Sequence, residues 1–313
     1  MYLVCFAHSG QPLPLFRLKW SDGKALKASD FVYAWNRAAS AELGADYGYM
    51  FELVVGYENV AKGVAGAKLA AVADDAARTI TVTIATDVAY WNELLAFPNY
   101  FPVREDVVAN ENWATDAKTY VGNGPYTISG WDHDSNIVLK KNPNYHGTVT
   151  MQTINCHLSD DANNMLTNYK NGAWQLIDSI PTAEIQTLRS TYPTEFKADG
   201  RIGTYYISWN INARILPKDS TLTGVEAELA QQEIRRAIGL LLDRNYIVNV
   251  VAQGGEVPAS SFVAMGMKNP DGSEFYKIAN STTDNFDGYY DVSEAAFEAN
   301  VERAIEILKN YYP

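Results

Sequence analysis

Cysteine is scarce in this chain, because its 313 residues include only Cys5 and Cys156. The two form no C-x-x-C pair and lack the spacing of a zinc site, so neither a disulfide-rich scaffold nor a zinc module is expected. A single disulfide and two free thiols both remain open. Long apolar runs are also missing. No stretch of about 18 apolar residues occurs, so no membrane-spanning helix is predicted.

The beginning of the chain carries no clear export signal. Residues 1–6 are apolar but too few to form the apolar region of a signal peptide. Cys5 follows Leu3 and Val4, and this is a poor lipidation site because a small residue is normally required just before the cysteine. If the protein is exported, we expect its leader to be absent from this chain.

Positive charge is in deficit. Lys and Arg total 25 against 37 Asp and Glu, which makes the formal net charge −12, and Lys and Arg form no run. An acidic chain repels the phosphates of nucleic acids and anionic lipids, so no nucleic-acid partner is predicted.

Catalytic and metal-binding motifs are missing as well. The four histidines show no H-E-x-x-H spacing, and G-x-S-x-G, G-x-G-x-x-G and the P-loop pattern do not occur. The adjacent acids of Asp74-Asp75 and Asp160-Asp161 do not face each other, so neither is an acid/base pair. Asp284, Asp287 and Asp291 lack the register of a calcium loop. We therefore predict no catalytic residue, no metal and no cofactor, although an enzyme built from dispersed residues remains possible.

Tyrosine, by contrast, is abundant. The chain has 20 Tyr and 7 Trp, and 47% of its residues are apolar. Tyr combines a wide apolar face with a hydroxyl and suits adaptable recognition surfaces, although many of these rings must also form the core. The length accommodates more than one domain.

Apolar periodicity predicts a mixture of helices and strands. Residues 204–210 are a strong strand candidate, and an apolar stripe runs through 221–242. This order predicts a mixed α/β (α+β) protein of more than one lobe, with a ligand between the lobes. The other predicted strands are 15–20, 79–85, 126–128, 137–139 and 153–158. The other predicted helices are 28–40, 88–97, 162–171, 181–189, 244–252 and a last one starting at Asp291 or Ser293. Residues 98–102 are expected to be irregular because they include two prolines.

Five sequence blocks carry a family resemblance. Residues 19–37 read K-W-S-D-G-K-A-L-K-A-S-D-F-V-Y-A-W-N-R, and a second block comprises V-G-N-G-P-Y at 121–126, Trp131 and K-N-P-N-Y at 141–145. Three shorter blocks follow at 169–172, 205–210 and 234–244. In this order they resemble the blocks of the extracellular solute-binding proteins of family 5, the oligopeptide- and dipeptide-binding group.

The resemblance implies a class II periplasmic-binding-protein clamshell, with two hinged lobes and an extra domain in one of them. Residues 13–102 would form the extra domain, 103–208 part of the first lobe, and 209–313 the N-terminal part of the second. Members usually have more residues before the first block and run well beyond Pro313. The chain is therefore expected to be truncated at both ends, with the clamshell incomplete.

The implied function is that of the substrate-binding component of an ABC-type peptide importer. Such a protein captures oligopeptides mainly through their backbone and delivers them to a membrane permease. It would be extracellular, either as a membrane-anchored lipoprotein or in the periplasm, and it would not be an enzyme. Two alternatives remain: the same fold with a nickel chelate, haem, a sugar or a signalling peptide as ligand, or a shortened copy that binds no ligand.

The resemblance also nominates ligand-binding residues in three segments. One is the strand candidate 204–210, one follows the turn at Gly172, and one is an aromatic loop of the extra domain. Trp20, Trp35 and Trp131 are expected to serve packing instead. The predicted ligand-binding residues are Tyr205, Tyr206, Asn210, Asp178, Ser179, Tyr47 and Tyr49.

Overall fold

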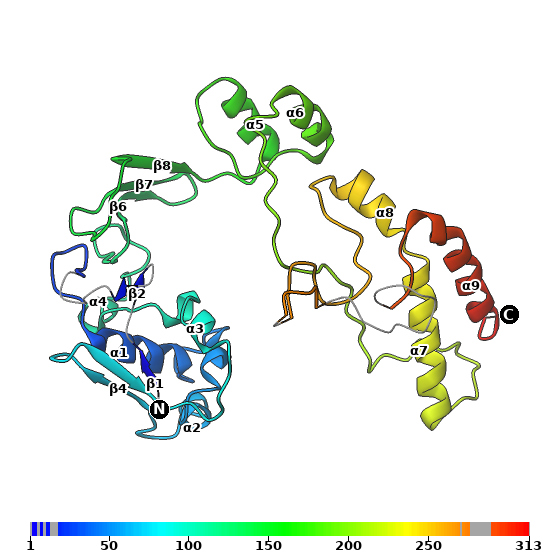
Figure 1. Cartoon of the computed structure of the whole chain (residues 1–313), viewed down its shortest axis with the longest axis horizontal. Coiled ribbons are helices and arrows are strands. Elements are labelled where there is room, and N and C mark those ends of the chain that lie inside the picture. The colour runs from blue at the N-terminus through cyan, green and yellow to red at the C-terminus, as the bar shows by residue number, and fades with distance from the viewer. Residues whose placement is uncertain are drawn as a thin grey trace. The chain divides into compact units, whose positions relative to one another are not determined.

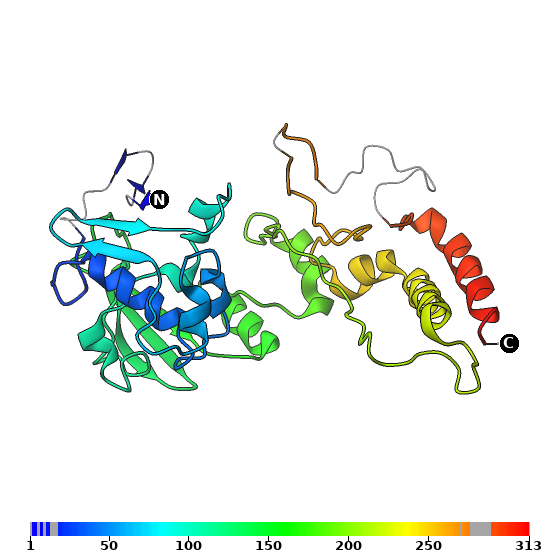
Figure 2. The same cartoon turned by 90° about the horizontal axis from the view of Figure 1, so that it is seen from below.

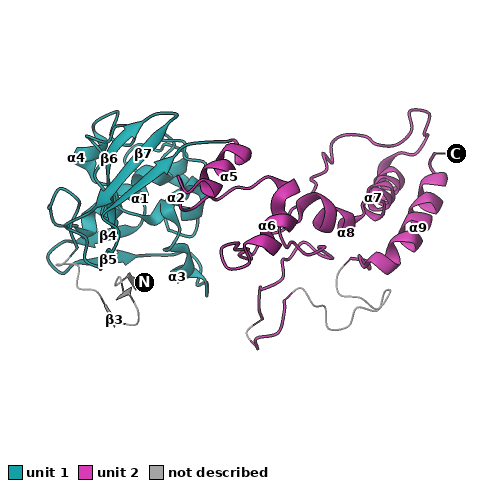
Figure 3. Ribbon diagram, turned by 90° about the horizontal axis from the view of Figure 1, so that it is seen from above, with its two compact units in different colours: residues 1–160 teal, residues 161–313 magenta. Residues whose placement is uncertain are grey.

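The computed structural model describes residues 2–4, 7–8, 11–12, 18–269, 271–275 and 289–312. The chain forms two compact units, residues 1–160 and 161–313, which are described separately (Figure 3). Cys5, Asp284, Asp287 and the first part of the predicted strand 15–20 lie outside the described residues. Its last residues form only an isolated bridge, Lys19 to Ala25.

A helix packed on a three-stranded sheet organises the first unit (Figure 1). Helix α1 (Ala28–Ala39) has the apolar spacing of an amphipathic helix and buries Phe31 and Trp35. The sheet has the order β1-β5-β4, and both of its pairings are antiparallel. Alternation in β5 turns Ile80 and Val82 into the core, where both are fully buried. The strands are β1 (Tyr2–Val4), β4 (Ala71–Asp74) and β5 (Thr79–Val82).

Aromatic side chains fill the core of this unit, and the polar groups of Trp35 and Tyr100 are hydrogen-bonded, whereas the buried Nε1 of Trp91 has no partner among the described residues. Trp35 Nε1 donates to the carbonyl of Tyr100 at 2.8 Å, and the Tyr100 hydroxyl donates to the carbonyl of Met50 at 2.6 Å. The Tyr100 ring also packs edge-on against Trp35 and at 4.6 Å between centroids from Phe51. Burial raises the pKa of Tyr100 well above its ordinary value. The packing role expected of Trp20 and Trp35 is confirmed, since both are buried.

A second sheet of the first unit has the order β6-β7-β8 and is antiparallel throughout. Ile128, Leu139 and Ile154 lie opposite one another across the three strands, as do Trp131, Ile137 and Cys156, so one face is apolar. None of the residues in these strands is fully buried. The strands are β6 (Tyr126–Asp132), β7 (Asn136–Lys141) and β8 (Thr153–His157). Both β6 and β7 are longer than the sequence predicts.

Helices dominate the described part of the second unit. Figures 1 and 2 both show α7 (Gly224–Leu240) beside α9 (Phe297–Lys309), and these two helices pack on each other. The buried face of α7 consists of Ala227, Ala230, Ile234, Ala237 and Leu240. Helix α5 (Ala162–Lys170) is capped by the Asp161 carboxylate, and α6 (Ile185–Thr191) follows it.

The remaining helices and strands of both units are short. Strands β2 and β3 form a two-stranded antiparallel pair, and Asp243 caps α8 as the sequence predicts, accepting from the Tyr246 amide at 2.9 Å. These elements are β2 (Ala7–His8), β3 (Gln11–Pro12), α2 (Tyr57–Ala61), α3 (Trp91–Leu94), α4 (Glu105–Val108), α8 (Arg244–Tyr246), the π-helix η5 (Ile247–Ala252) and the 3₁₀ helices η2 (Gly48–Phe51), η3 (Pro98–Tyr100), η4 (Thr182–Glu184) and η6 (Glu294–Ala296).

Two predictions about secondary structure are wrong in an informative way. Residues 204–210 form no strand, because their main chain pairs with no strand among the described residues. The helix expected over 88–97 is reduced to the single turn of α3. The family's three-part division, 13–102, 103–208 and 209–313, stays a prediction.

Within the described ranges, no helix is long and apolar enough to cross a membrane. The same residues contain no cluster of His, Cys, Asp and Glu that could hold a metal ion.

Candidate functional site

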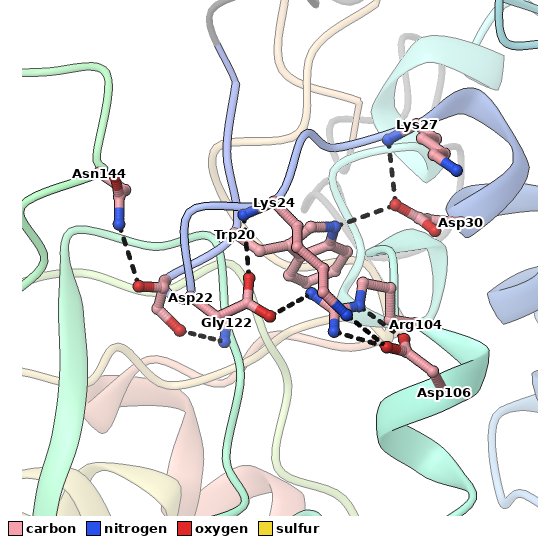
Figure 4. A network of polar contacts seen from close by, with 10 residues as sticks. Trp20, Asp22, Lys24, Lys27, Asp30, Arg104, Asp106, Gly122 and Asn144 are labelled. Carbon is pink, nitrogen blue, oxygen red and sulfur yellow. Dashed lines mark hydrogen bonds and ion pairs between the residues drawn. The ribbon is translucent and has the colours of Figure 1, made fainter.

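The first two sequence blocks meet in the structure, although about 100 residues separate them. The Ser21 amide donates to the carbonyl of Gly122 at 2.8 Å, and the Gly122 amide points back to the Ser21 hydroxyl at 3.3 Å. Asn144 Nδ2 donates to the Ser21 carbonyl at 3.0 Å (Figure 4). The turn of the first block thus holds both ends of the second.

A buried arginine fastens this junction. Arg104, whose side chain is only 9% exposed, binds Asp106 through two parallel bonds, Nε to Oδ1 at 2.7 Å and Nη2 to Oδ2 at 2.8 Å. Its Nη1 reaches Asp22 of the first block at 2.7 Å (Figure 4). Lys24 adds a further bond to Asp106 at 2.8 Å. The planar guanidinium suits this forked arrangement in a way that an ammonium cannot.

The charges of this cluster shift its pKa values. Hydrogen bonds from Arg104 and then Lys24 hold the pKa of Asp106 well below its ordinary value. For Asp22, burial raises the pKa, but the hydrogen bonds and charges of Arg104 and Lys24 outweigh burial and leave the pKa lowered. Both aspartates are therefore ionised at neutral pH and serve as ion-pair partners, so neither is available as a proton donor.

Trp20 of the same block connects the junction to α1. Its Nε1 donates to Asp30 at 3.0 Å, and the same carboxylate oxygen accepts from the Lys27 amide at 3.0 Å. The guanidinium carbon of Arg104 lies 5.9 Å from the centroid of the Trp20 ring. These contacts make the first block a structural anchor that joins the start of α1, the turn at Gly122 and the start of α4.

Tyr47 and Tyr49, predicted as ligand contacts, lie together on the surface of the first unit. Their ring centroids are 6.1 Å apart, and the Tyr47 ring is 5.3 Å from Phe97. The side chain of Asn99 donates to the Tyr47 carbonyl at 2.9 Å. The two tyrosines are about half exposed (49% and 53%), so their aromatic rings are accessible from solvent.

Tyr205, Tyr206 and Asn210 lie in a segment without regular structure. Tyr205 is fully exposed and Tyr206 is 62% exposed, with its ring in edge contact with Phe262 at 4.9 Å. Asn210 accepts the Asn212 amide on its side chain at 3.1 Å, which forms a turn. Among the residues described here, the amides and carbonyls of 204–209 make no hydrogen bond.

Asp178 and Ser179 are exposed and also lie outside helices and strands. No hydrogen bond joins them to Tyr205, Tyr206 or Asn210 within the described part of the second unit. The structure therefore brings the two tyrosines of the first unit together, but it does not join the two groups of the second unit. The ligand-binding roles of all seven residues stay predictions.

Sequence reasoning missed the residues that build the junction. Asn142 is almost fully buried, donates to the Gly124 carbonyl at 2.8 Å and accepts the Asn144 amide at 2.9 Å. Asp75, noted in the sequence only as one of two adjacent acids, accepts the amide and the hydroxyl of Ser29, both at 2.8 Å. The K-N-P-N-Y block contains Asn142, but Arg104 and Asp75 lie outside every block, so no signal pointed to them.

Comparison with known structures defines the class of protein. The chain superposes with a TM-score of 0.70 on OppA from Burkholderia pseudomallei, with 26% identity, covering 94% of this chain and 54% of that one. The predicted fold class, a mixed α/β protein of the class II periplasmic-binding type, is confirmed.

The chain belongs to the bacterial extracellular solute-binding proteins, family 5, whose middle-region profile matches residues 17–310. Relatives from Bacillus subtilis (strain 168) include the dipeptide-binding protein DppE, 29% identical over 82% of this chain, and the oligopeptide-binding protein OppA, 30% identical over 80% of it. The chain spans less than half of each of these relatives, 45% in both cases. The predicted family is confirmed, and its members are binding proteins rather than enzymes.

Proposed function

We propose that the protein serves as the substrate-binding component of an ABC-type peptide importer and captures oligopeptides mainly through their backbone. Two things support this: its family, and its relatives named as dipeptide- and oligopeptide-binding proteins. The partners are then a peptide and a membrane permease, with no catalysis, and the location is extracellular, as a lipoprotein or in the periplasm.

The observation that carries the proposal is the open main chain of 204–209. These residues are rich in aromatic and β-branched side chains, which favour strands, yet their amides and carbonyls have no partner among the described residues. An extended peptide has the same need for partners, so pairing as an added strand satisfies both chains. Main-chain pairing leaves the peptide's side chains largely unread, so such a site is expected to accept many sequences.

Selective methylation of a peptide backbone tests this reading. We would titrate the protein with tri-alanine to penta-alanine peptides and with matched peptides whose alternate amides are N-methylated, and follow the melting temperature and calorimetric heat. Loss of one or two hydrogen bonds is expected to weaken binding about tenfold for the methylated peptides. Equal binding of both peptide sets would refute backbone capture.

Point variants identify the segment. Asn210→Ala and Tyr206→Ala are expected to weaken peptide binding severalfold, because each removes a polar or aromatic contact of about 1 kcal/mol. Val225→Ala on α7, also highly exposed, is the matched control. Incubation of the peptides with the protein, followed by mass spectrometry, is expected to show no cleavage, and turnover would favour an enzyme.

The alternatives predict different results. A non-peptide ligand predicts that the alanine peptides leave the melting temperature unchanged while native mass spectrometry of the purified protein shows another bound compound. A shortened copy without binding predicts neither a thermal response nor a bound compound, together with association through unpaired strand edges.

A further inference from the structure

A cleft at the end of α5 has no assigned role. Its volume is about 330 Å³, and it lies entirely within the second unit. This volume falls at the lower end of the range that small-molecule sites occupy. The cleft is lined by Tyr169, Lys170, Gly172, Trp174, Gln175, Tyr192 and Glu195.

The local sequence builds one wall of this cleft by ending α5 abruptly. Gly172 adopts φ = +74°, the left-handed conformation that closes helices and suits glycine. The amides of Ala173 and Trp174 then both donate to the carbonyl of Asn168, at 2.9 and 3.2 Å. These two bonds hold the Trp174 ring beside the last turn of α5, where Tyr169 lies.

The opposite wall comes from the end of α6. The Tyr192 amide donates to the Leu188 carbonyl at 2.8 Å and ends the helix. The amides of Glu195 and Phe196 both donate to the Tyr192 carbonyl in a turn, and Tyr192 and Glu195 both line the cleft. The Tyr169 hydroxyl donates to the Glu195 carboxylate and so joins the two walls.

Three rings that are partly exposed and one carboxylate therefore line the same cleft. The hydrogen bond to Glu195, with the negative charge of Glu195, raises the pKa of Tyr169. The only cation of the lining, Lys170, lies 3.6 Å from Glu184, so its charge is partly balanced outside the aromatic group. The faces of aromatic rings carry negative potential, and the carboxylate adds to it, so the cleft favours a cation.

We propose that this cleft binds a positively charged group on a short apolar stem, the guanidinium or ammonium group of an arginine-like or lysine-like compound. The rings of Tyr169, Trp174 and Tyr192 pack on the stem and the face of the cation, and the Glu195 carboxylate accepts its N–H groups. An anion of equal size is repelled by the same carboxylate. The site does not depend on the proposed peptide-import function.

A pair of probes of nearly equal shape isolates the charge. N-acetyl-L-arginine amide and its neutral counterpart N-acetyl-L-citrulline amide differ in the charge of the terminal group, while their backbone amides are the same. Binding is measured by Trp fluorescence and NMR chemical shifts. We expect saturable binding of the arginine probe with Kd on the order of 1 mM, and at least about tenfold weaker binding of the citrulline probe. Equal binding of both probes would overturn the proposal.

Four variants locate the binding. Glu195→Gln, Trp174→Leu and Tyr192→Leu are each expected to weaken arginine-probe binding about fivefold or more. Tyr246→Leu, which changes an exposed tyrosine of the same unit that does not line the cleft, is the matched control and should leave the affinity unchanged. If the three cleft variants bind as the control does, the cleft is not the site.

Tyr169→Phe distinguishes a loss of binding from a loss of folding. This variant keeps the ring but frees the Glu195 carboxylate from its internal hydrogen bond, so the arginine probe is expected to bind at least as tightly as to the parent protein. A purely structural role of the Tyr169–Glu195 bond predicts a loss of binding together with a lower melting temperature, which would count against the proposal.

The cation can come from a free compound or from a peptide side chain. A penta-alanine peptide with a central arginine is compared with one carrying citrulline, on the parent protein and on Glu195→Gln. A preference for the arginine peptide that Glu195→Gln abolishes supports a side-chain subsite, and binding of the capped amino acid alone supports a small-molecule site. If the proposed peptide-import function is wrong, penta-alanine does not bind, but the preference for arginine over citrulline remains.

Discussion

Arg104 and Asp106, only two residues apart, form a two-pronged ion pair at 2.7 and 2.8 Å, and Arg104 extends the same guanidinium to Asp22 of a distant block. Three nitrogen atoms of one nearly buried side chain are thereby paired. The arginine thus joins segments that are separated by 82 residues, in the unit that also carries the aromatic pair Tyr47–Tyr49.

Replacing Arg104 measures its contribution to the stability of the first unit. Arg104→Met is expected to lower the free energy of unfolding by about 2–4 kcal/mol, because it leaves Asp22 and Asp106 without their main partner. Arg104→Lys should recover less than half of this loss, because lysine cannot form the two parallel bonds. Urea unfolding measures both changes.

The control for this series is Lys62→Met, which breaks an exposed pair with Glu58 on α2. It is expected to change stability by less than about 0.5 kcal/mol. A similar effect for Lys62→Met and Arg104→Met would contradict the role given to Arg104.

Acid should weaken the same junction. The pKa values of Asp22 and Asp106 are lowered in the folded protein, so their contribution to stability is complete above the unfolded value of about 3.9 and is lost as the pH falls through the folded values. Between about pH 5 and 3, the free energy of unfolding of Asp106→Asn should therefore fall by roughly 0.5–1 kcal/mol less than that of the parent protein. The difference is modest because Asp106 is half exposed.

Unfolding in urea at several pH values gives this difference directly. A parallel decline of parent and variant over that interval would show that Asp106 titrates alike in the folded and unfolded chains. Glu58→Gln, which removes a carboxylate of an exposed ion pair outside the junction, is the control variant.

Asp75 should stabilise the start of α1. Asp75→Ala removes both bonds to Ser29 and is expected to cost about 1–2 kcal/mol, in the range of a lost helix cap. Ser29→Ala removes only the bond from the hydroxyl and should cost less. Thermal unfolding by circular dichroism ranks the two, with Asp46→Ala, another exposed aspartate of the unit, as control; a reversed order would contradict the cap.

Two glycines with left-handed backbones separate conformational strain from steric overlap. At Gly66 (φ = +75°) an added Cβ meets nothing within 4 Å, so Gly66→Ala should cost about 1–2 kcal/mol. At Gly56 (φ = +94°) the same atom would lie 2.4 Å from the Lys68 carbonyl oxygen, so the loss should exceed that of Gly66→Ala by about 2 kcal/mol or more. Equal losses would mean that the chain near Lys68 yields easily.

The aromatic pair of the first unit should affect ligand binding without affecting folding. If the proposed function holds, Tyr49→Ala should weaken alanine-peptide binding about three- to tenfold, because an aromatic contact contributes roughly 0.5–1.5 kcal/mol. Tyr90→Ala, which is exposed to the same extent, should bind as the parent does. Calorimetric titration distinguishes them, and a loss in both would indicate a general effect.

Periodicity alone located most of the regular structure. The alternation in Thr79–Val82 and the apolar stripe of α1 were sufficient because each pattern matches a local geometry and one clear burial direction. On α7, by contrast, Leu229 is apolar yet 57% exposed, while Ala227 and Ala230 are buried. Which stripe of that helix is covered depends on the position of α9, and this is not encoded in the local pattern.

The sequence by itself determined the family, the secondary-structure pattern and the absence of known catalytic motifs, because motifs and periodicities are properties of neighbouring residues. Only the tertiary structure decided that Tyr205–Trp209 has no strand partner among the described residues, that Arg104 pairs with Asp22 and Asp75 with Ser29, and that Tyr169, Trp174, Tyr192 and Glu195 line one cleft. Pairing, ion bonding and enclosure join residues that are distant along the chain, so they depend on how the chain folds back on itself.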